Sequence, residues 1–298
     1  MSLRALTARY LPTPILDTLK TAKYNIERWT FPRHVVSHRY GPFEFSMNIH
    51  DRVAKEWYDK RWELPPEIDF LSRGALASGA LVFDLGAHQC LIAMMLAKLA
   101  GSGGKVIAVE ANSHNATVAA LNIKTNGVPN VGIVHALISD KTGMDFAALS
   151  FNSSKAFSDG DGQDGELVES LTVDDLSHAF GWPQVVYMDI EGFEIGALKG
   201  ASRTLAHGCT WFIELHGDEQ LSRYGAKNDD VLQFFPPEEF TTHLCLSTEV
   251  GFRLLSDRER LPRERCFLTF ISRCSDTGEG GAAGDGREVP PGRSAMNS

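Results

Sequence analysis

Short apolar runs alternate with helix-like patterns through the middle of the chain. Each run has the length of a strand that is buried on both faces. The first helix-like segment, 91–100, lies between the first and second runs and is stopped by Gly101. The second, 113–126, lies between the second and third runs, with Ser113 or Asn112 as its N-cap and Gly127 as its terminator. This alternation predicts right-handed crossovers in a doubly wound, mostly parallel α/β sheet with helices on both faces. The runs are Leu81–Leu85, Val106–Glu110, Val131–His135, Val185–Ile190 and Trp211–Leu215.

The first 75 residues follow a different pattern. Residues 38–49 hold a Gly-Pro turn followed by alternating apolar positions, which predicts a β-hairpin. Pro65 and Pro66 stand at the start of a predicted helix that continues to residue 76. We therefore expect an N-terminal hairpin and helical extension over residues 1–75, followed by the main domain at 76–274.

After the fifth run, the patterns that predict helices and strands are less distinct. A short helix is predicted at 229–235, and strand-like stretches at 251–255 and 266–272 are expected to finish the sheet with an antiparallel edge. Ser150–Gly165 is typical of a long flexible insertion, and loops of that length often serve as lids. Residues 275–298 are rich in Gly, Pro and Ser, which predicts a disordered tail.

Composition and charge narrow the class of protein. A chain of 298 residues with 43% hydrophobic content can form one large α/β domain with additions. A net charge of -9 and a pI near 5.6 disfavour a nucleic-acid partner. No apolar run approaches a transmembrane segment, and two prolines interrupt the N-terminal apolar stretch, so no signal peptide is predicted. Five scattered cysteines without a C-x-x-C pair favour reduced thiols and a cytoplasmic location.

The segment Val82–Cys90 (VFDLGAHQC) suggests a ligand site. A buried strand ends at Asp84, turns through Gly86 and enters a helix, and ligands of doubly wound sheets bind outside such strand ends. A dinucleotide-binding turn needs G-x-G-x-x-G, so that backbone amides can approach a pyrophosphate, but only Gly86 is present. The acid would repel a phosphate. It suits a ligand that carries an ammonium and a sulfonium, such as S-adenosylmethionine.

A second acid supports this interpretation. Glu110 ends the next strand, where a carboxylate can accept hydrogen bonds from both ribose hydroxyls. Either acid alone could be a solvated strand-end carboxylate or a helix cap. Together, in register with a strand–turn–helix–strand unit, they favour cofactor binding.

Further distinctive stretches follow in order: VIAVEANSHNATVAALNIKTNG, HALISDKTG, LTVDDL, VYMDIEGFEIGALKGASRTL and WFIELHG. With VFDLGAHQC they make the chain resemble the FkbM family of S-adenosylmethionine-dependent methyltransferases over about residues 65–217. The run Asp189–Glu194 (DIEGFE) is the most specific of them. The resemblance implies a class I, Rossmann-like methyltransferase fold, S-adenosylmethionine as cofactor, and a hydroxyl of a small molecule or saccharide as substrate. The cofactor-binding residues expected from the turn and the resemblance are Asp84, Gly86, Ala87, His88, Cys90, Glu110, Asn112, Ala136 and Asp189.

One position departs from the family, which usually has glycine where this chain has Cys90. Glycine there lets the backbone approach the methionine part of the cofactor closely. A cysteine either crowds the pocket or packs as a small apolar residue at the start of the helix, and we expect the second. His88, in the same turn, is expected to contact the cofactor's carboxylate.

Three polar residues lie at or just beyond the ends of the fourth and fifth runs and are predicted to be catalytic: Asp189, Glu191 and His216. Buried acids are costly unless paired, so the two carboxylates need an explanation. Glu191 could cap a helix that begins near Gly192. His216 is the predicted general base, because an imidazole with a free pKa of roughly 6.5 can take a proton from an attacking alcohol. His135 is expected to pack rather than react.

Other mechanisms and functions stay open. A divalent metal could lower the pKa of the hydroxyl with Asp189, Glu191 and Glu214 as ligands. Alternation along WFIEL could instead turn Glu214 away, and we predict no required metal. The leading hypothesis is an O-methyltransferase. An NAD-dependent oxidoreductase is disfavoured by the missing glycines, and a non-catalytic cofactor-binding or assembly protein is supported only by Cys90.

Overall fold

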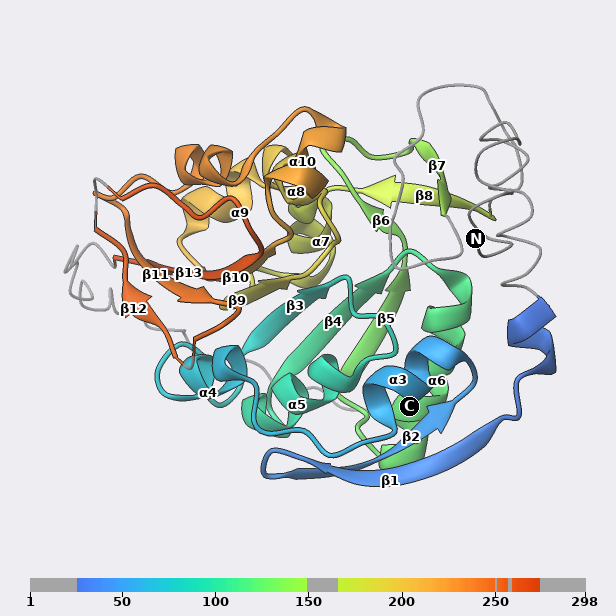
Figure 1. Cartoon of the computed structure of the whole chain (residues 1–298). Coiled ribbons are helices and arrows are strands. Elements are labelled where there is room, and N and C mark those ends of the chain that lie inside the picture. Colours follow the sequence, from blue (N-terminus) through green and yellow to red (C-terminus); the bar gives the residue numbers. More distant parts are fainter. Residues whose placement is uncertain (1–25, 149–165, 250, 257–258, 274–298) are drawn as a thin grey trace, which may run out of the picture.

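The computed structural model describes residues 26–148, 166–249, 251–256 and 259–273. Its centre is an eight-stranded sheet with the order β12-β11-β13-β10-β9-β3-β4-β5 (Figure 1). The five predicted runs form parallel neighbours in this sheet, with ends shifted by at most two residues. The predicted doubly wound sheet is confirmed. The strands are β3 (Leu81–Leu85), β4 (Lys105–Glu110), β5 (Val131–His135), β9 (Val185–Met188) and β10 (Thr210–Leu215).

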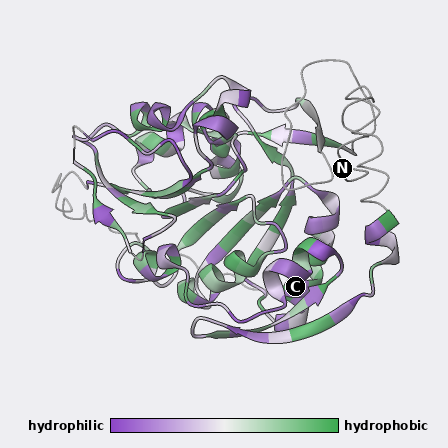
Figure 2. Ribbon diagram, in the orientation of Figure 1, coloured by the Kyte–Doolittle hydropathy of each residue, from purple (hydrophilic) through white to green (hydrophobic). Residues whose placement is uncertain are grey.

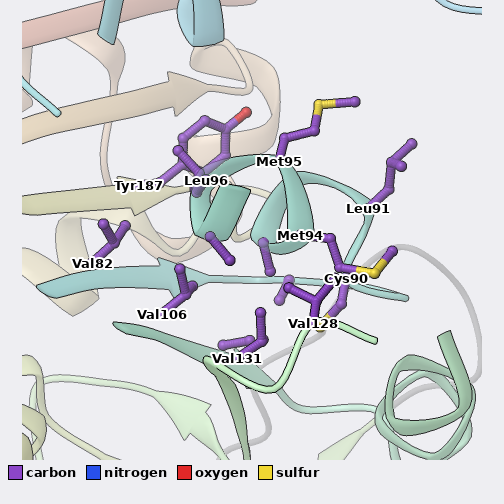
Figure 3. Close-up of a cluster of buried hydrophobic side chains, with 14 of the residues drawn as sticks. Val82, Cys90, Leu91, Met94, Met95, Leu96, Val106, Val128, Val131 and Tyr187 are labelled. Carbon is purple, nitrogen blue, oxygen red and sulfur yellow. The ribbon is translucent and has the colours of Figure 1, made fainter. Parts of the chain in front are cut away.

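Helices cover both faces of the sheet. Successive strand residues point to opposite sides, and both sides of these strands are apolar. Val82 of β3 belongs to one apolar cluster, and its neighbour Phe83 belongs to the other. The first face carries α4 (Pro66–Ser72), α5 (Leu91–Ala100) and α6 (Ser113–Asn126); the second carries α7 (Val173–Phe180), α8 (Glu194–Lys199) and α9 (Ser202–His207). Figure 2 shows hydrophobic residues along the central strands, and Figure 3 shows α5 side chains over Val82, Val106 and Val131.

The parallel order reverses between β3 and β9. Chain order runs outward from β3 through β4 to β5 on one side, and from β9 to β10 on the other. Crevices for ligands form at such a switch point, outside the carboxyl ends of the strands. Asp84 and Asp189 stand at or beyond the ends of these two adjacent strands.

The sheet continues beyond β10 in an unexpected order. β13 (Cys266–Ser272) is antiparallel to β10 and also to β11 (Phe240–Leu246), with β12 (Arg253–Leu254) outside. The two strand-like stretches finish the sheet with an antiparallel edge, as predicted, with β12 outermost. β11, which the sequence did not predict, pairs between them. The helix expected at 229–235 is a 3₁₀ helix, η2 (Asn228–Phe234), and is preceded by α10 (Asp218–Leu221) and η1 (Ser222–Tyr224).

The N-terminal extension contains the predicted hairpin, β1 (His34–Tyr40) and β2 (Phe43–Ile49), and an unpredicted helix, α3 (Arg52–Tyr58). Tyr40 and Phe45 lie in the same core cluster as the α5 side chains. The Asn122 side chain of α6 accepts a hydrogen bond from the backbone N–H of Asn48, at 2.7 Å. The extension is therefore packed onto the main domain. The predicted helix at Pro65 is confirmed as α4, although it ends at Ser72.

A small second sheet was not predicted. It joins β6 (Leu137–Ile138), β8 (Glu166–Leu171) and β7 (Asp145–Ala148) in that order. The insertion expected at Ser150–Gly165 and the tail expected at 275–298 lie outside the described residues. Within the described ranges, no helix is long and apolar enough to cross a bilayer.

Candidate active site

A cavity of about 320 Å³ opens at the carboxyl ends of the parallel strands. Its size lies in the lower part of the range for small-molecule sites. Two of the predicted site residues, Cys90 and His216, are not on its wall. The predicted residues that do line it are Asp84, Gly86, Ala87, His88, Glu110, Asn112, Ala136, Asp189 and Glu191.

Asp84 is a buried carboxylate without a complete set of partners. The residue is 1% exposed, and its Oδ2 has no hydrogen-bond partner among the described residues. Burial, with the charges of Asp189 and Glu110, raises the pKa of Asp84 to about 8. An unpaired buried charge is unfavourable unless a counter-charge arrives. The cavity therefore offers a place for a positively charged ligand at the end of β3.

The turn after β3 requires glycine. Gly86 has φ +89, and a Cβ there would lie 1.8 Å from the carbonyl oxygen of Asp189. The backbone N–H groups of Gly86 and Ala87 both donate to the Val109 carbonyl, at 2.9 and 3.0 Å. The turn is thus pressed against the ends of β9 and β4, which brings Asp189 next to the predicted cofactor turn.

Backbone strain is concentrated in this cavity's loops. Among the described residues, the non-glycine residues with positive φ are His88 (48°), Cys90 (65°) and Glu191 (57°). Such conformations are costly for L-residues and cluster at functional sites. They also explain the family's usual glycine at position 90. The Cys90 thiol is fully buried at the start of α5, so it packs as a small apolar residue, as predicted.

Glu110 joins the loop after β3 to the loop after β4 through two hydrogen bonds. Its Oε2 accepts the backbone N–H of His88, and its Oε1 accepts the backbone N–H of Asn112, each at 2.8 Å. Burial raises the Glu110 pKa despite these hydrogen bonds. Oε1 also accepts a hydrogen bond from the Asn115 side chain, at 3.4 Å, so Oε2 is the oxygen that keeps a free lone pair for a ligand hydroxyl. His135 was expected to pack, but it is exposed, with Nε2 3.0 Å from the Ala111 carbonyl oxygen.

The extension supplies one wall of the cavity, which the sequence did not predict. Asp51 caps α3 through Ala54 and also accepts hydrogen bonds from the side chains of Gln89 and His114, at 2.8 and 2.9 Å. Burial alone would raise the Asp51 pKa, but these hydrogen bonds lower it to about 2. The extension is therefore fixed to the loop before α5 and to the first turn of α6. Its residues on the cavity wall are Asp51, Val53, Trp57, Tyr58, Trp62 and Glu67.

Tyr58 fixes the ring of His88. The tyrosine hydroxyl is hydrogen-bonded to Nδ1 of His88. Burial lowers the His88 pKa to about 4, so this imidazole is neutral at ordinary pH. Burial also raises the Tyr58 pKa well above its usual value, so the hydroxyl keeps its proton. The pair can hold a defined tautomer on the cavity wall.

His216 lies behind the wall and is surrounded by carboxylates. Its side chain is 8% exposed, and Nδ1 lies 2.9 Å from Oε1 of the buried Glu194. Nε2 faces oxygens of Asp189, Glu191 and Glu214 at 3.4, 3.3 and 3.4 Å. Burial alone would lower the His216 pKa, but the surrounding carboxylates raise it to about 9. The imidazole is therefore protonated at neutral pH in the ligand-free protein.

Glu214 points into this cluster and lines the cavity, so of the two orientations left open by the sequence it does not take the one that turns it away. Both faces of β10 are buried, and the strand has no solvent side for it. Arg265, just before β13, contacts Glu214. Burial raises the pKa of Glu191, while His216 opposes the rise. The helix cap considered for Glu191 is not formed, because Glu194 accepts the Gly192 N–H instead, at 2.9 Å.

The sequence of the chain matches the methyltransferase FkbM domain over residues 84–254, more than half of its length. The chain belongs to the FkbM methyltransferase family. It is thus an S-adenosylmethionine-dependent methyltransferase, and its sheet is that of the class I, Rossmann-like enzymes. The family resemblance seen in the motifs is confirmed. The match begins at Asp84, so it omits the extension that walls the cavity.

This FkbM-family chain is similar, at low sequence identity, to solved structures of other methyltransferases. An S-adenosylmethionine-dependent O-methyltransferase from Thermotoga maritima is 14% identical, with a TM-score of 0.43, and the match covers 82% of this chain and 78% of that one. A putative O-methyltransferase from Klebsiella pneumoniae is 12% identical, with a TM-score of 0.41 and coverages of 91% and 95%. A putative rRNA methylase from Clostridium thermocellum is 11% identical, with a TM-score of 0.44 and coverages of 69% and 93%. No curated protein matches the chain.

Proposed function

We propose that this FkbM-family enzyme transfers the methyl group of S-adenosylmethionine to a hydroxyl of a small molecule or saccharide. The observation that carries the proposal is one continuous cavity with an unpaired buried carboxylate, Asp84, at its cofactor end. At the other end stand Asp189, Glu191 and Glu214, which can accept protons. The cavity thus offers a site for a cationic donor beside a site for a hydroxyl.

The cofactor end fits S-adenosylmethionine. The free oxygen of Asp84 supplies the counter-charge that a ligand with an ammonium and a sulfonium needs. Oε2 of Glu110 has a lone pair left for a ribose hydroxyl, and the Gly86 turn has no side chain to exclude the ligand. The bound cofactor supplies a methyl group activated on its sulfonium. Ala87, Asn112 and Ala136 complete this part of the wall.

His88 is suited to hold the carboxylate of the cofactor. The backbone N–H of Gln89 donates a hydrogen bond to the Tyr58 hydroxyl oxygen. The hydroxyl of Tyr58 in turn donates its own proton to Nδ1 of His88. Nε2 of the neutral imidazole then carries its hydrogen. An N–H donor on the cavity wall can bind a carboxylate without adding a second positive charge beside the sulfonium.

The acceptor end orients the hydroxyl and takes its proton. Asp189 lies against the Gly86 turn, so a hydroxyl bound there is close to the cofactor end. With the cofactor bound as methyl donor, a carboxylate of Asp189 or Glu191 would take the proton of the hydroxyl that accepts the methyl group. In-line positioning of this kind supplies much of the acceleration in direct transfer. The charge of His216 and its place behind the wall favour a positioning role for it over that of the base.

The charge of the cavity favours a neutral hydroxyl substrate over a nucleic acid. Seven carboxylates line it, with Arg265 as the one cation among the described lining residues. A phosphate backbone is attracted by basic surfaces and would be repelled by this wall. The Cys90 side chain, which alone supported a non-catalytic assembly protein, does not enter the cavity.

A transfer assay tests the proposal. The purified protein is incubated with methyl-labelled S-adenosylmethionine and pools of saccharides, hydroxylated small molecules or RNA. We expect label in a saccharide or small-molecule pool, and a rate lowered roughly 10²–10⁴-fold in Glu191→Gln. Glu219→Gln, in the exposed part of α10, is the matched control and should keep the full rate. Labelling of RNA alone contradicts the substrate class, and cofactor binding without transfer to any pool favours the assembly protein.

A further inference from the structure

The geometry around His216 is that of a ligand set rather than of a hydrogen-bond network. Nε2 faces three carboxylate oxygens at 3.3 to 3.4 Å. N–H···O hydrogen bonds are shorter, at about 2.7–3.2 Å, and a single N–H cannot serve three acceptors. Ligand atoms of Asp189, Glu214 and His216 all lie within 4.8 Å of one another. They therefore surround a common point.

One of these oxygens lacks the partner that burial demands. Asp189 Oδ1 is buried, with no hydrogen bond to any described residue. Glu214 Oε1 is also buried, and Arg265 forms an ion pair with it. The Arg265 side chain is 46% exposed, and it leaves Asp189 Oδ1 unpaired. Buried acceptors without partners are costly, which points to a ligand.

Glu194 holds the imidazole in the orientation that a metal ligand needs. Its side chain is fully buried, and Oε1 lies 2.9 Å from Nδ1 of His216. The same oxygen accepts the backbone N–H of Gly192, so Glu194 is itself fixed. A carboxylate on one ring nitrogen directs the other toward a metal in many metalloproteins. Here the other nitrogen, Nε2, faces Asp189, Glu191 and Glu214.

The charge balance also requires a cation. Four carboxylates surround the ring, from Asp189, Glu191, Glu194 and Glu214. His216 and Arg265 are the cations that contact them. Ionisation of all four carboxylates would leave two negative charges uncompensated. A divalent ion between Asp189 and Glu214 would remove this excess.

We propose that Asp189, Glu214 and His216 bind a divalent cation, with Glu191 close enough to join them. A mixture of carboxylate oxygen and one imidazole nitrogen suits an ion such as Mn²⁺. The cation would leave positions open toward the cavity, where it could bind the acceptor oxygen and ease loss of its proton. That catalytic role rests on the proposed function, whereas binding of the ion does not. The inference replaces our expectation of no required metal.

Binding of Mn²⁺ to the cofactor-free protein is measured by calorimetry and by electron paramagnetic resonance. We expect saturable binding with one ion per chain. Glu214→Gln should weaken it at least about tenfold, the effect of about 1.4 kcal/mol. Glu219→Gln, an exposed carboxylate change on α10, should leave it unchanged. Arg265→Ala should tighten it, because the guanidinium competes for Glu214. Far-ultraviolet circular dichroism confirms that each variant is folded.

The outcomes separate the cation site from the enzyme activity. No binding at millimolar Mn²⁺, or equal binding in wild type and Glu214→Gln, overturns the site. Should Glu214→Gln fail to fold, Asp189→Asn replaces it with the same expected loss. Methyl transfer that persists in a chelator, together with absent binding, overturns the site and leaves the proposed function intact. If Mn²⁺ binding changes in the variants as predicted but no acceptor is methylated, the cation site is supported and the proposed function is contradicted.

Discussion

Asp84→Asn should make stability less sensitive to pH. The Asp84 pKa is raised from 3.8 to about 8 by burial and neighbouring carboxylates. The folded protein therefore holds a proton that the unfolded chain releases above about pH 4. A group with a raised folded pKa contributes stability at low pH and loses it as pH rises through the folded value. The asparagine side chain does not titrate, so the variant does not lose folding stability in this way as the pH rises.

The size of the effect follows from the shift. Each unit of pKa difference corresponds to about 1.36 kcal/mol, so the full shift is worth roughly 5–6 kcal/mol. Between about pH 5 and pH 8 the stability of the variant relative to wild type should rise by roughly 4 kcal/mol. The same substitution removes the counter-charge for the cofactor. Its affinity for S-adenosylmethionine should fall about 10- to 150-fold, the equivalent of 1.5–3 kcal/mol.

Urea unfolding of both proteins at a series of pH values measures the first effect, and calorimetry with S-adenosylmethionine measures the second. Glu44→Gln, an exposed carboxylate change in the hairpin, is the control and should follow wild type. If the stability difference between Asp84→Asn and wild type is the same at low and high pH, the reasoning about the buried carboxylate is wrong. An unchanged dissociation constant would mean that Asp84 does not face the cofactor.

Three further substitutions test the cofactor loops. Glu110→Gln turns an amide N–H toward a backbone N–H donor. It should therefore raise the dissociation constant for S-adenosylmethionine, measured by calorimetry, at least about tenfold. An unchanged dissociation constant would refute the assignment of Glu110 to the ribose. Gly86→Ala places a Cβ 1.8 Å from a backbone oxygen, so it should lower the melting temperature and abolish binding, and a normal melting curve would contradict the turn. Cys90→Gly relieves strain of about 1 kcal/mol at φ 65 and should bind the cofactor equally or more tightly, whereas a large loss would identify the thiol as a contact.

The sequence predicted those parts of the site that depend on one strand and its following turn. Asp84 and Glu110 could be placed because each ends a short apolar run, and parallel strands share one carboxyl edge. The orientation of Glu214 stayed open because alternation separates the two faces of a strand only where one face is solvated, and both faces of β10 are buried. The raised pKa of His216 depends on three carboxylates, Glu194, Asp189 and Glu191, that meet around it only in the folded chain.

Residues brought by distant segments could not be found in the same way. Arg265 reaches the cavity because β13 enters between β10 and β11, an order that local patterns do not encode. Trp57 and Asp51 reach it because the extension packs across α5 and α6. The predicted strand at 266–272 and the predicted hairpin were both present, but their positions depend on tertiary packing.

The place of β13 constrains the order in which the chain can fold during synthesis. β11 emerges first, yet it joins the sheet only through β13, which pairs with both β10 and β11. Until residues 266–272 arrive, the edge of β10 is a free apolar strand, and such edges recruit other chains. The pairing of Trp211 with Phe270 closes a long loop and should be slow. Arg265 and Phe267 arrive with this strand, so a nascent chain that lacks it has the cofactor turn but not a finished cavity wall.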